Sequence, residues 1–370
     1  MEELLRTVTT VFLFVLILGG LVLIHELGHF VTARLAKVRV LEFGIGFPPR
    51  AKILRSKGET LYTLNWLPIG GFVKLEGEDG DKATDPRAFS SKSLPVRLGI
   101  LVSGVVMNIL LAFVIFTGIV WLASPQVGAK FAEVQEGSPA AAAGLTPGDT
   151  IVAVNGQRFQ FFIQPSMVEV LRANAGQSVT LTVHGADGAT REVTTTLRDR
   201  SQIDADHGAL GIVDIQTAYD GATTSNDLGT AITFGWDQTV AAMGIIVGGL
   251  ASLFGGLVTD PTAAPEGAAG PIGIAVTIGD YFFRTGPIFT LFIAGILSAN
   301  LAVVNILPFP PLDGGRMLMI TLKRIFGSRI SLRAEQMTYL VGFVFLFTFL
   351  IWVSGFDVVR LLNGGTLPPP

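Results

Sequence analysis

An uncharged run of 17 residues, Val8 to Ile24, leads directly into the motif His-Glu-Leu-Gly-His at residues 25–29. Apolar sequence of this length predicts a helix that spans a membrane, here over about residues 5–35. Two histidines four residues apart lie on one helical face, so the imidazoles of His25 and His29 can reach a single ion. Glu26 lies beside that face, where it could hold and deprotonate a water on the ion. The motif therefore predicts a zinc hydrolase site inside a membrane helix.

The alternative is a chance match, because a short motif of this kind also occurs in soluble helices. The setting disfavours it, since each ionisable side chain near the centre of a bilayer costs about 2.5–3.5 kcal/mol on insertion scales. Three such side chains fall within five residues, and this segment holds two of the four histidines in the chain. His25, Glu26 and His29 are therefore expected to be functional.

The composition agrees with a membrane protein of two or three units. The chain has 370 residues, of which 49% are hydrophobic and only 15% are charged. Cysteine is absent, which excludes disulfides and thiolate metal sites. The expected partners are the lipid bilayer and membrane proteins, and no nucleic-acid partner is expected.

Four stretches are predicted to span the membrane. Besides residues 5–35, these are residues 98–123, 285–312 and 336–356, each free of charged side chains over a spanning length. A cleaved signal peptide is disfavoured at the N-terminus because the apolar run continues into His25 and Glu26 rather than into a small-residue cleavage site. Residues 238–259 are also uncharged, but their five glycines predict a poor helix.

The polar loop at residues 36–97 contains short runs rich in β-branched and aromatic residues, separated by Pro and Gly. These runs, at residues 39–47, 51–54, 60–66 and 71–75, predict a small antiparallel sheet. One interpretation is an ordinary surface meander. The functional interpretation is a strand edge that pairs with an extended substrate, because a peptide bond must leave its helix before a metal site can attack it.

Residues 125–217 have the composition of a soluble α/β domain. The sequence Pro-Gly-Asp-Thr-Ile-Val-Ala-Val-Asn-Gly at residues 147–156 predicts a turn, a strand and a tight turn. A helix is expected at residues 164–173, with strands at residues 179–184 and 192–197. This combination resembles a PDZ domain. The resemblance implies a peptide-binding loop that follows the domain, as in the circularly permuted bacterial form, and that contains Gly208, Leu210, Gly211 and Ile212.

Charge decides the expected topology, because Lys and Arg collect in the short cytoplasmic loops of membrane proteins. Residues 34–97 hold twelve Lys and Arg and residues 316–333 hold five. Residues 124–286 hold only seven, with sixteen Asp and Glu. The first two segments are therefore expected inside, and residues 125–217 and both termini outside. A fifth span at residues 238–259 would break this pattern, so the segment 218–284 is expected to be interfacial or re-entrant.

The same topology predicts a third metal ligand. His25 and His29 lie near the inner end of the first span, and Asp313 lies at the same depth near the inner end of the third. A catalytic zinc needs three protein ligands and one open position, and Asp313 is the one carboxylate at the later spans that can supply the third. The alternative role of Asp313 is to cap the helix that follows. Asn108, in the second span, is expected to hold helices together rather than to take part in chemistry.

Several motifs together resemble the bacterial site-2 protease family, also called the regulator of sigma-E protease family. They are the His-Glu-Leu-Gly-His motif, Gly-Phe-Val-Lys-Leu at residues 71–75, Gly-Pro-Ile-Gly at residues 270–273, and the Asn-x-x-Pro-x-x-Pro-Leu-Asp-Gly pattern at residues 305–314. The resemblance covers nearly the full chain. One departure is that the chain has a single PDZ domain where some members have two.

This resemblance implies an intramembrane zinc metalloendopeptidase of the bacterial cytoplasmic membrane. It implies zinc ligands His25, His29 and Asp313 and a catalytic Glu26. It also implies substrates that are single-span membrane proteins, such as anti-sigma factors already trimmed outside. The substrate-binding residues that it implies are Asn305, Gly71, Phe72, Val73 and Leu75. The PDZ domain would bind a peptide or exclude bulky substrates.

The predicted fold is thus a polytopic α-helical membrane protein with a membrane-associated β-sheet and an inserted PDZ domain. Its expected parts are residues 1–124, 125–217, 218–284 and 285–370. Two other functions stay open. A membrane-tethered PDZ scaffold with a vestigial metal site is disfavoured because Glu26, which a scaffold does not need, is present. A metal transporter is disfavoured because few polar residues line the spans.

Overall fold

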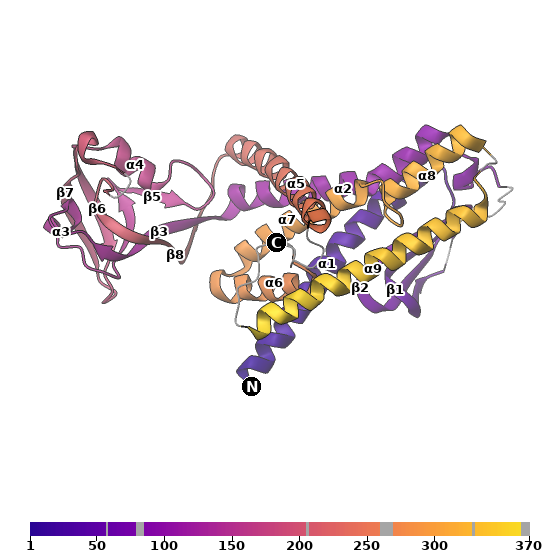
Figure 1. The fold of residues 1–370 in the computed structure, drawn as a ribbon, viewed down its shortest axis with the longest axis horizontal. Helices are drawn as coiled ribbons and strands as arrows, with labels where there is room; N and C mark the ends of the chain where they lie inside the picture. The colour runs from indigo at the N-terminus through magenta and orange to yellow at the C-terminus, as the bar shows by residue number, and fades with distance from the viewer. Residues whose placement is uncertain (57, 79–84, 205–206, 260–268, 328–329, 364–370) are drawn as a thin grey trace. The chain divides into compact units, whose positions relative to one another are not determined.

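The computed structural model describes the chain except for residues 57, 79–84, 205–206, 260–268, 328–329 and 364–370. The described chain divides into two compact units (Figure 1). The first unit combines Met1–Thr117 with Ile232–Pro370, and the second unit is Gly118–Ala231. We describe each unit separately.

The first unit consists mainly of long helices. They are α1 (Glu2–Leu35), α2 (Leu94–Ala123), α5 (Leu228–Thr259), α6 (Pro271–Thr285), α7 (Pro287–Ile306), α8 (Asp313–Phe326) and α9 (Leu332–Leu362). Within the part of the chain that the structure describes, α1, α2, α5 up to Leu253, α7 and α9 are long and apolar enough to cross a membrane. The chain is therefore a multi-pass membrane protein, and all four predicted spans lie on helices of this set.

The third predicted span differs from the helix that forms there. Residues 285–312 were expected to be one helix, whereas α7 ends at Ile306 and a new helix, α8, begins at Asp313. Pro308 explains the end of α7, because the residue before a proline is disfavoured in helical conformation, and Leu307 is indeed extended. The prolines at 310 and 311 keep the chain out of the helix until Asp313.

The segment expected to be interfacial or re-entrant, residues 218–284, contains the end of a strand followed by α5 and α6. Despite its five glycines, residues 238–259 belong to the long helix α5. Packing compensates for the low helix propensity, because Ala242 of α5 is buried in a cluster with Ala112 and Phe116 of α2. Gly235 belongs to the same contact, since a methyl group there would meet the hydroxyl of Thr117.

The loop between α1 and α2 folds into two long bent strands, β1 (Val40–Arg55) and β2 (Leu61–Leu75), rather than four short ones. Phe43 pairs with both Val73 and Tyr62, so the two strands curl back on each other. Across the sheet, neighbouring segments follow in the order 71–75, 40–47, 61–67 and 50–55. Gly46 and Gly70 have φ angles of 81° and 84°, which are accessible to glycine at little cost and let the strands bend.

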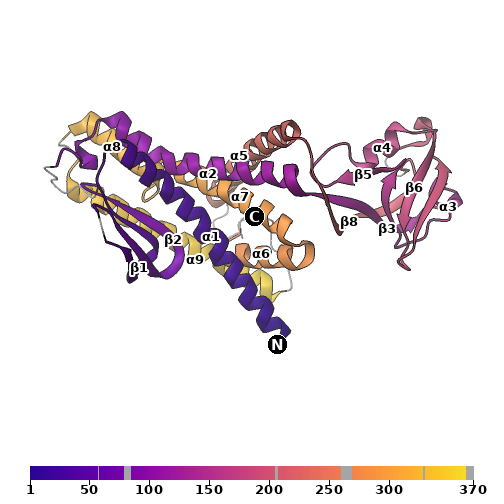
Figure 2. The same cartoon turned by 180° about the vertical axis from the view of Figure 1, so that it is seen from behind.

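The hairpin lies against the C-terminal half of α1, as both views of the ribbon show (Figures 1 and 2). Ala33 at the end of α1 is fully buried in a cluster with Val40 of β1 and Leu75 of β2. The approach is close, because a methyl group at Gly19 of α1 would lie 3.1 Å from the carbonyl oxygen of Pro68. The strand region is therefore held at the helix that carries the histidine motif.

Helices α6 and α9 are tied by a buried carboxylate. Asp357 of α9 is fully buried, and one of its oxygens accepts the backbone N–H of Gly273 at 2.9 Å. Gly273 lies in the first turn of α6, where backbone donors have no partner within the helix. Gly270 and Gly273 leave room for this contact, because a methyl group at either position would lie within 3 Å of the carboxylate.

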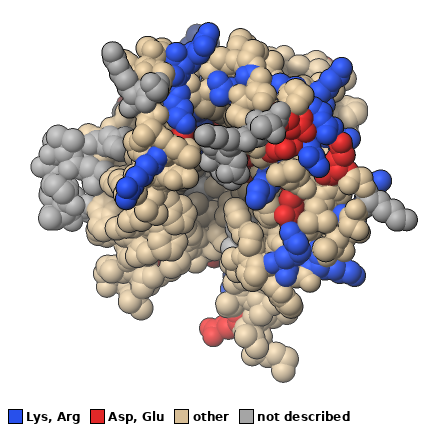
Figure 3. Space-filling model, turned by 90° about the vertical axis from the view of Figure 1, so that its right-hand side faces the viewer, with Lys and Arg blue, Asp and Glu red and all other residues tan. Residues whose placement is uncertain are grey.

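Basic side chains gather on one face of the first unit (Figure 3). This face carries the β1–β2 hairpin, the end of α8 and the start of α9. Lys52 and Arg55 of β1, Arg324 of α8 and Arg333 of α9 are all exposed. These residues belong to the segments that the charge count predicts to be cytoplasmic.

The second unit is a six-stranded antiparallel sheet with two short helices. The strands are β3 (Ser124–Val134), β4 (Thr150–Val154), β5 (Gln157–Gln160), β6 (Ser178–His184), β7 (Thr190–Thr196) and β8 (Ile212–Thr224), in the order β7-β6-β4-β5-β3-β8. The helices are α3 (Pro139–Ala142) and α4 (Met167–Ala173), and Phe131, Ile151 and Leu181 form the centre of the core. The predicted strands are present, but the helix predicted at residues 164–173 begins only at Met167, because Ser166 caps it. The sheet continues to Thr224, seven residues beyond the expected boundary at residue 217.

Candidate metal centre

Helix α1 presents His25 and His29 from successive turns, and both are buried, with 5% and 8% of their surface exposed. Contacts with α2 fix the orientation of both rings. The Nδ1 atom of His29 lies 2.8 Å from the carbonyl oxygen of Ile100 in α2, to which it can only donate a proton. When the neutral imidazole carries its one proton on Nδ1, the lone pair of Nε2 is available to a metal.

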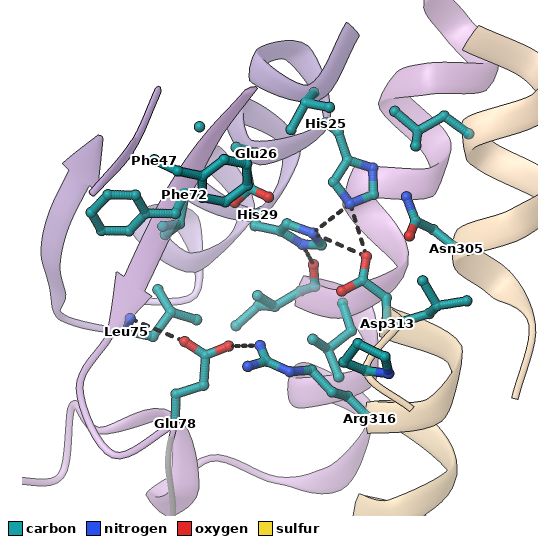
Figure 4. A pocket seen from close by; sticks show the side chains of 18 residues that line it. His25, Glu26, His29, Phe47, Phe72, Leu75, Glu78, Asn305, Asp313 and Arg316 are labelled. Atoms are coloured by element: carbon teal, nitrogen blue, oxygen red, sulfur yellow. Dashed lines mark hydrogen bonds and ion pairs between the residues drawn. The ribbon is translucent and has the colours of Figure 1, made fainter. Parts of the chain in front are cut away.

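Asp313 reaches the same place from the start of α8. Its Oδ2 atom lies 2.9 Å from Nε2 of His25 and 3.2 Å from Nε2 of His29 (Figure 4). The cap position of α8 belongs to Leu312, which argues against a capping role for Asp313. Gly314 and Gly315 let the preceding loop pack directly on the helix, since a methyl group on either would lie within 2.5 Å of the backbone of residues 306–309.

The three side chains have the geometry of a metal site. Their ligand atoms all lie within 4.8 Å of one another, and the two Nε2 atoms are 3.1 Å apart. Ligand atoms placed about 2.0 Å from a tetrahedral ion lie about 3.3 Å from each other, so these separations fit zinc. To act as the third ligand, the carboxylate of Asp313 must be ionised.

Asn108 of α2 makes two contacts with other helices. Its backbone carbonyl accepts the hydroxyl of Ser298 in α7 at 2.8 Å, a contact that does not use its side chain. In addition, its side-chain amide lies 3.2 Å from Nδ1 of His25 and is fully buried. A metal-bound His25 carries its N–H on Nδ1. If the amide of Asn108 is flipped, its oxygen faces this N–H and accepts it. This orientation also gives a partner to Oδ1, which otherwise has none.

Glu26 lies beside these ligands, on the wall of a cavity of about 470 Å³. The cavity is also lined by His25, His29 and Asp313. A methyl group at Gly71 of β2 would lie 3.9 Å from the Cγ atom of Glu26, so the strand edge passes close to this carboxylate. The arrangement can activate a water next to a metal and hold an extended peptide beside it.

The substrate-binding residues expected from the sequence also line this cavity. They are Gly71, Phe72, Val73 and Leu75 of β2 and Asn305 in the last turn of α7. Figure 4 shows Asn305 on the side of His25 and Asp313, opposite Phe72 and Leu75. The structure thus brings together one cavity wall from the strand and one from the helices.

Two cavity residues have no motif in the sequence to identify them. Glu78 follows β2, and Arg316 lies three residues after Asp313 on α8. They form an ion pair between positions 238 residues apart. No local pattern predicts such a contact, because each residue taken alone is an ordinary charged residue in a polar segment.

The loop expected to bind peptides in the second unit packs against α3. The carbonyl of Leu210 accepts the N–H of Ala140 at 2.9 Å, and the side chain of Leu210 is buried. Gly211 has a φ angle of 82° and leads into β8, which begins at Ile212. The carbonyl oxygen of Gly208 accepts a hydrogen bond from Nη1 of Arg198 at 2.8 Å. These residues lie on one loop, and their binding of a peptide stays a prediction.

Comparison with known proteins gives a consistent result. The family model "Peptidase family M50" matches residues 13–349. A relative in Clostridium acetobutylicum, named as a candidate zinc metalloprotease, is 33% identical and covers 94% of this chain and 97% of its own. Zinc metalloprotease RasP of Geobacillus kaustophilus is 26% identical over 96% of this chain and 99% of its own length. RasP of Oceanobacillus iheyensis is 27% identical, with coverage of 95% and 99%.

Among solved structures, the PDZ domain of an SdrC-like protein from Listeria innocua matches with 25% identity. The match covers 23% of this chain and 91% of that domain, with a TM-score of 0.18.

Proposed function

Because the chain belongs to peptidase family M50, we propose that it is a zinc metalloprotease that cuts single-span membrane proteins within the membrane. The observation that carries the proposal is the meeting of His25, His29 and Asp313 beside Glu26 in a cavity with a strand edge on its wall. Relatives that match almost the whole chain are named zinc metalloproteases. The three ligand atoms are a donor set that suits zinc and leaves one position open.

The proposed chemistry divides between the metal and the protein. Zinc, when bound, acts as a Lewis acid and lowers the pKa of water towards about 7. Glu26 takes the proton of the attacking water and returns it to the leaving amine. His29, held by the carbonyl of Ile100, and His25, held by Asn108, keep their Nε2 atoms aimed at one point. Asn305 would hydrogen-bond the peptide on the helical wall of the cavity.

Substrate must reach this site in extended form. A helix that unwinds in a membrane exposes backbone groups that cost several kcal/mol each unless they find partners. We infer that the segment 71–75 of β2 receives the substrate as an added strand. Phe72, Val73 and Leu75 favour strand conformation, and Leu75 anchors the strand in the buried cluster with Ala33 and Val40.

The charge distribution supports an orientation in the membrane. The basic face of the first unit would lie on the cytoplasmic side, with both termini and residues 125–217 outside (Figure 3). The relatives named above are bacterial, which supports the bacterial cytoplasmic membrane. Residues 125–217 would form a PDZ domain that binds a peptide or excludes bulky substrates, and residues 238–259 would lie at the interface or re-enter.

The other two functions explain less of the structure. A scaffold with a vestigial site needs neither Glu26 nor a supported pair of imidazoles. A metal transporter needs polar groups along a path through the helices, whereas the polar groups around the metal centre converge on one point.

The decisive experiment replaces Glu26 by Gln. Purified Glu26→Gln protein in lipid vesicles should hold one zinc per chain, as the wild-type protein does, because the three ligands are intact. It should cut a single-span membrane peptide at least about 100-fold more slowly, because the proton acceptor is gone. Asp313→Ala should lose the zinc as well. Cleavage by Glu26→Gln near the wild-type rate would refute the proposed mechanism.

A further inference from the structure

The strand edge that faces the cavity has a defined set of hydrogen-bonding groups. Within the described chain, residues 71–75 of β2 pair with β1 on one side, with Gly71 opposite Ile45 and Val73 opposite Phe43. Neighbouring residues of an antiparallel strand turn their N–H and C=O groups to opposite sides. Glu76, which directly follows β2, donates its N–H to Arg39 at 3.0 Å, on the β1 side. Leu75, Val73 and Gly71 therefore turn their backbone groups to the cavity.

One of these three N–H groups already has a partner. The backbone N–H of Leu75 donates to Oε2 of Glu78 at 3.2 Å. The other carboxylate oxygen of Glu78 pairs with the guanidinium of Arg316 (Figure 4). The side chain of Glu78 is largely buried, with 12% exposed, and charge-assisted pairs of this kind are the stronger hydrogen bonds in proteins. Glu78 thus stands where the carbonyl of an added strand would otherwise bind.

We propose that Glu78, held by Arg316, is a register stop for the substrate strand. It leaves the N–H groups of Gly71 and Val73 open to substrate and closes that of Leu75. This inference rests on the proposed protease function with strand addition. Arg316 is a positioning residue, because it acts on the substrate only through Glu78.

The stop acts at a fixed distance from the chemistry. Gly71 lies next to Glu26, and Leu75 is four residues, or about 13 Å, further along the strand. A strand can slip only by two residues if its side chains are to keep their faces. If the substrate strand slipped so that it paired with Leu75, it would have to displace the carboxylate of Glu78, which the ion pair with Arg316 holds in place. The pair therefore favours one peptide bond over the bond two residues away.

The test uses a single-span membrane peptide with a uniform Leu-Ala segment, so that its side chains do not choose the bond. Wild-type enzyme should give one main product by mass spectrometry. Glu78→Leu removes the acceptor and should add a product displaced by two residues, with KM lowered about 2- to 10-fold by the extra hydrogen bond. Glu78→Gln keeps a carbonyl oxygen for Leu75 and should retain the wild-type product. Arg316→Met frees the carboxylate and should give a smaller share of the displaced product.

Glu76→Leu is the matched control, because it removes an ion pair with Arg39 from the same segment without touching the cavity edge. It should leave the product pattern unchanged. A wild-type pattern in Glu78→Leu, with normal zinc content, would overturn the register stop. Loss of zinc in both Glu78→Leu and Arg316→Met would also overturn it, since the pair would then serve the metal centre.

A further variant separates this inference from the proposed function. Val73→Pro removes a strand N–H that substrate is expected to use. If Val73→Pro cuts normally, strand addition itself is wrong. If Val73→Pro is slow while Glu78→Leu keeps the wild-type product, strand addition stands and only the register stop fails. Absence of zinc-dependent cleavage in the wild-type protein would instead refute the proposed function.

Discussion

Gly104 of α2 gives the sharpest test of how the metal centre is packed. A methyl group at this position would lie 2.5 Å from Nε2 of His29 and 2.7 Å from Cε1 of His25. Carbon contacts are favourable only from about 3.5 Å, so each ring would have to move by about 1 Å. Metal-ligand distances tolerate only about 0.2 Å. The variant Gly104→Ala therefore forces the two imidazoles out of the geometry that suits an ion.

The magnitude follows from the side-chain torsions. Turning an imidazole about 30° away from its rotamer costs about 0.5–1.5 kcal/mol, and two rings give about 1–3 kcal/mol. Zinc affinity should fall about 5- to 140-fold, since about 1.4 kcal/mol is a factor of ten. The helix itself should not suffer, because alanine is favoured over glycine by about 0.8–1.0 kcal/mol in a helix interior.

The assay is competition for zinc with a fluorescent chelator, on purified protein in detergent. Gly99→Ala is the matched control, because it lies on the same helix and a methyl group there meets nothing within 4 Å. Equal zinc affinity of Gly104→Ala and Gly99→Ala would refute this account of the packing. Unchanged helix content by circular dichroism would show that lost affinity does not come from unfolding.

Three other variants test separate parts of the structure. Asn108→Leu should weaken zinc binding about 10- to 100-fold, because it removes the partner of His25, and unchanged affinity in the chelator assay would contradict this. Val73→Pro should keep its zinc and slow the cleavage of membrane peptides. Substrates with a destabilised helix should not restore the cleavage rate of Val73→Pro. If they did restore it, helix unwinding rather than pairing with β2 would limit the rate. Asp357→Ala should lower the free energy of unfolding by about 1.5–3 kcal/mol, because the N–H of Gly273 loses a charged acceptor, and an unchanged thermal midpoint would argue against the tie between α6 and α9.

The sequence predicted the parts of the fold that local pattern determines. Runs without charge became helices because their backbone groups must be paired within the segment in a membrane. The spacing of His25 and His29 predicted a shared helical face, and the depth argument proposed Asp313 as the third ligand; in the structure the three side chains lie close together. In the strand region, β-branched and aromatic runs predicted strands, but their joining into two bent ones depends on Gly46 and Gly70, whose φ angles the sequence alone does not give.

The errors have physical causes. The third span was expected to continue to residue 312 because its composition is uncharged, although Pro308 ends the helix earlier. The low helix propensity of residues 238–259 was outweighed by packing on α2. The contacts that support the site were not predictable, because Asn108 near His25 and Glu78 near Arg316 join residues 83 and 238 positions apart.

The first turn of α8 contacts both the metal centre and the strand edge of the cavity. Asp313 contacts the imidazoles, and Arg316, three residues later, holds the carboxylate that closes the strand edge. Residues three apart lie on the same side of a helix, so a rotation or shift of α8 moves both contacts together. Gly314 and Gly315, between them, pack the turn against the preceding loop and leave little room for independent movement. One turn of α8 therefore carries both the metal ligand and the residue that positions the proposed register stop.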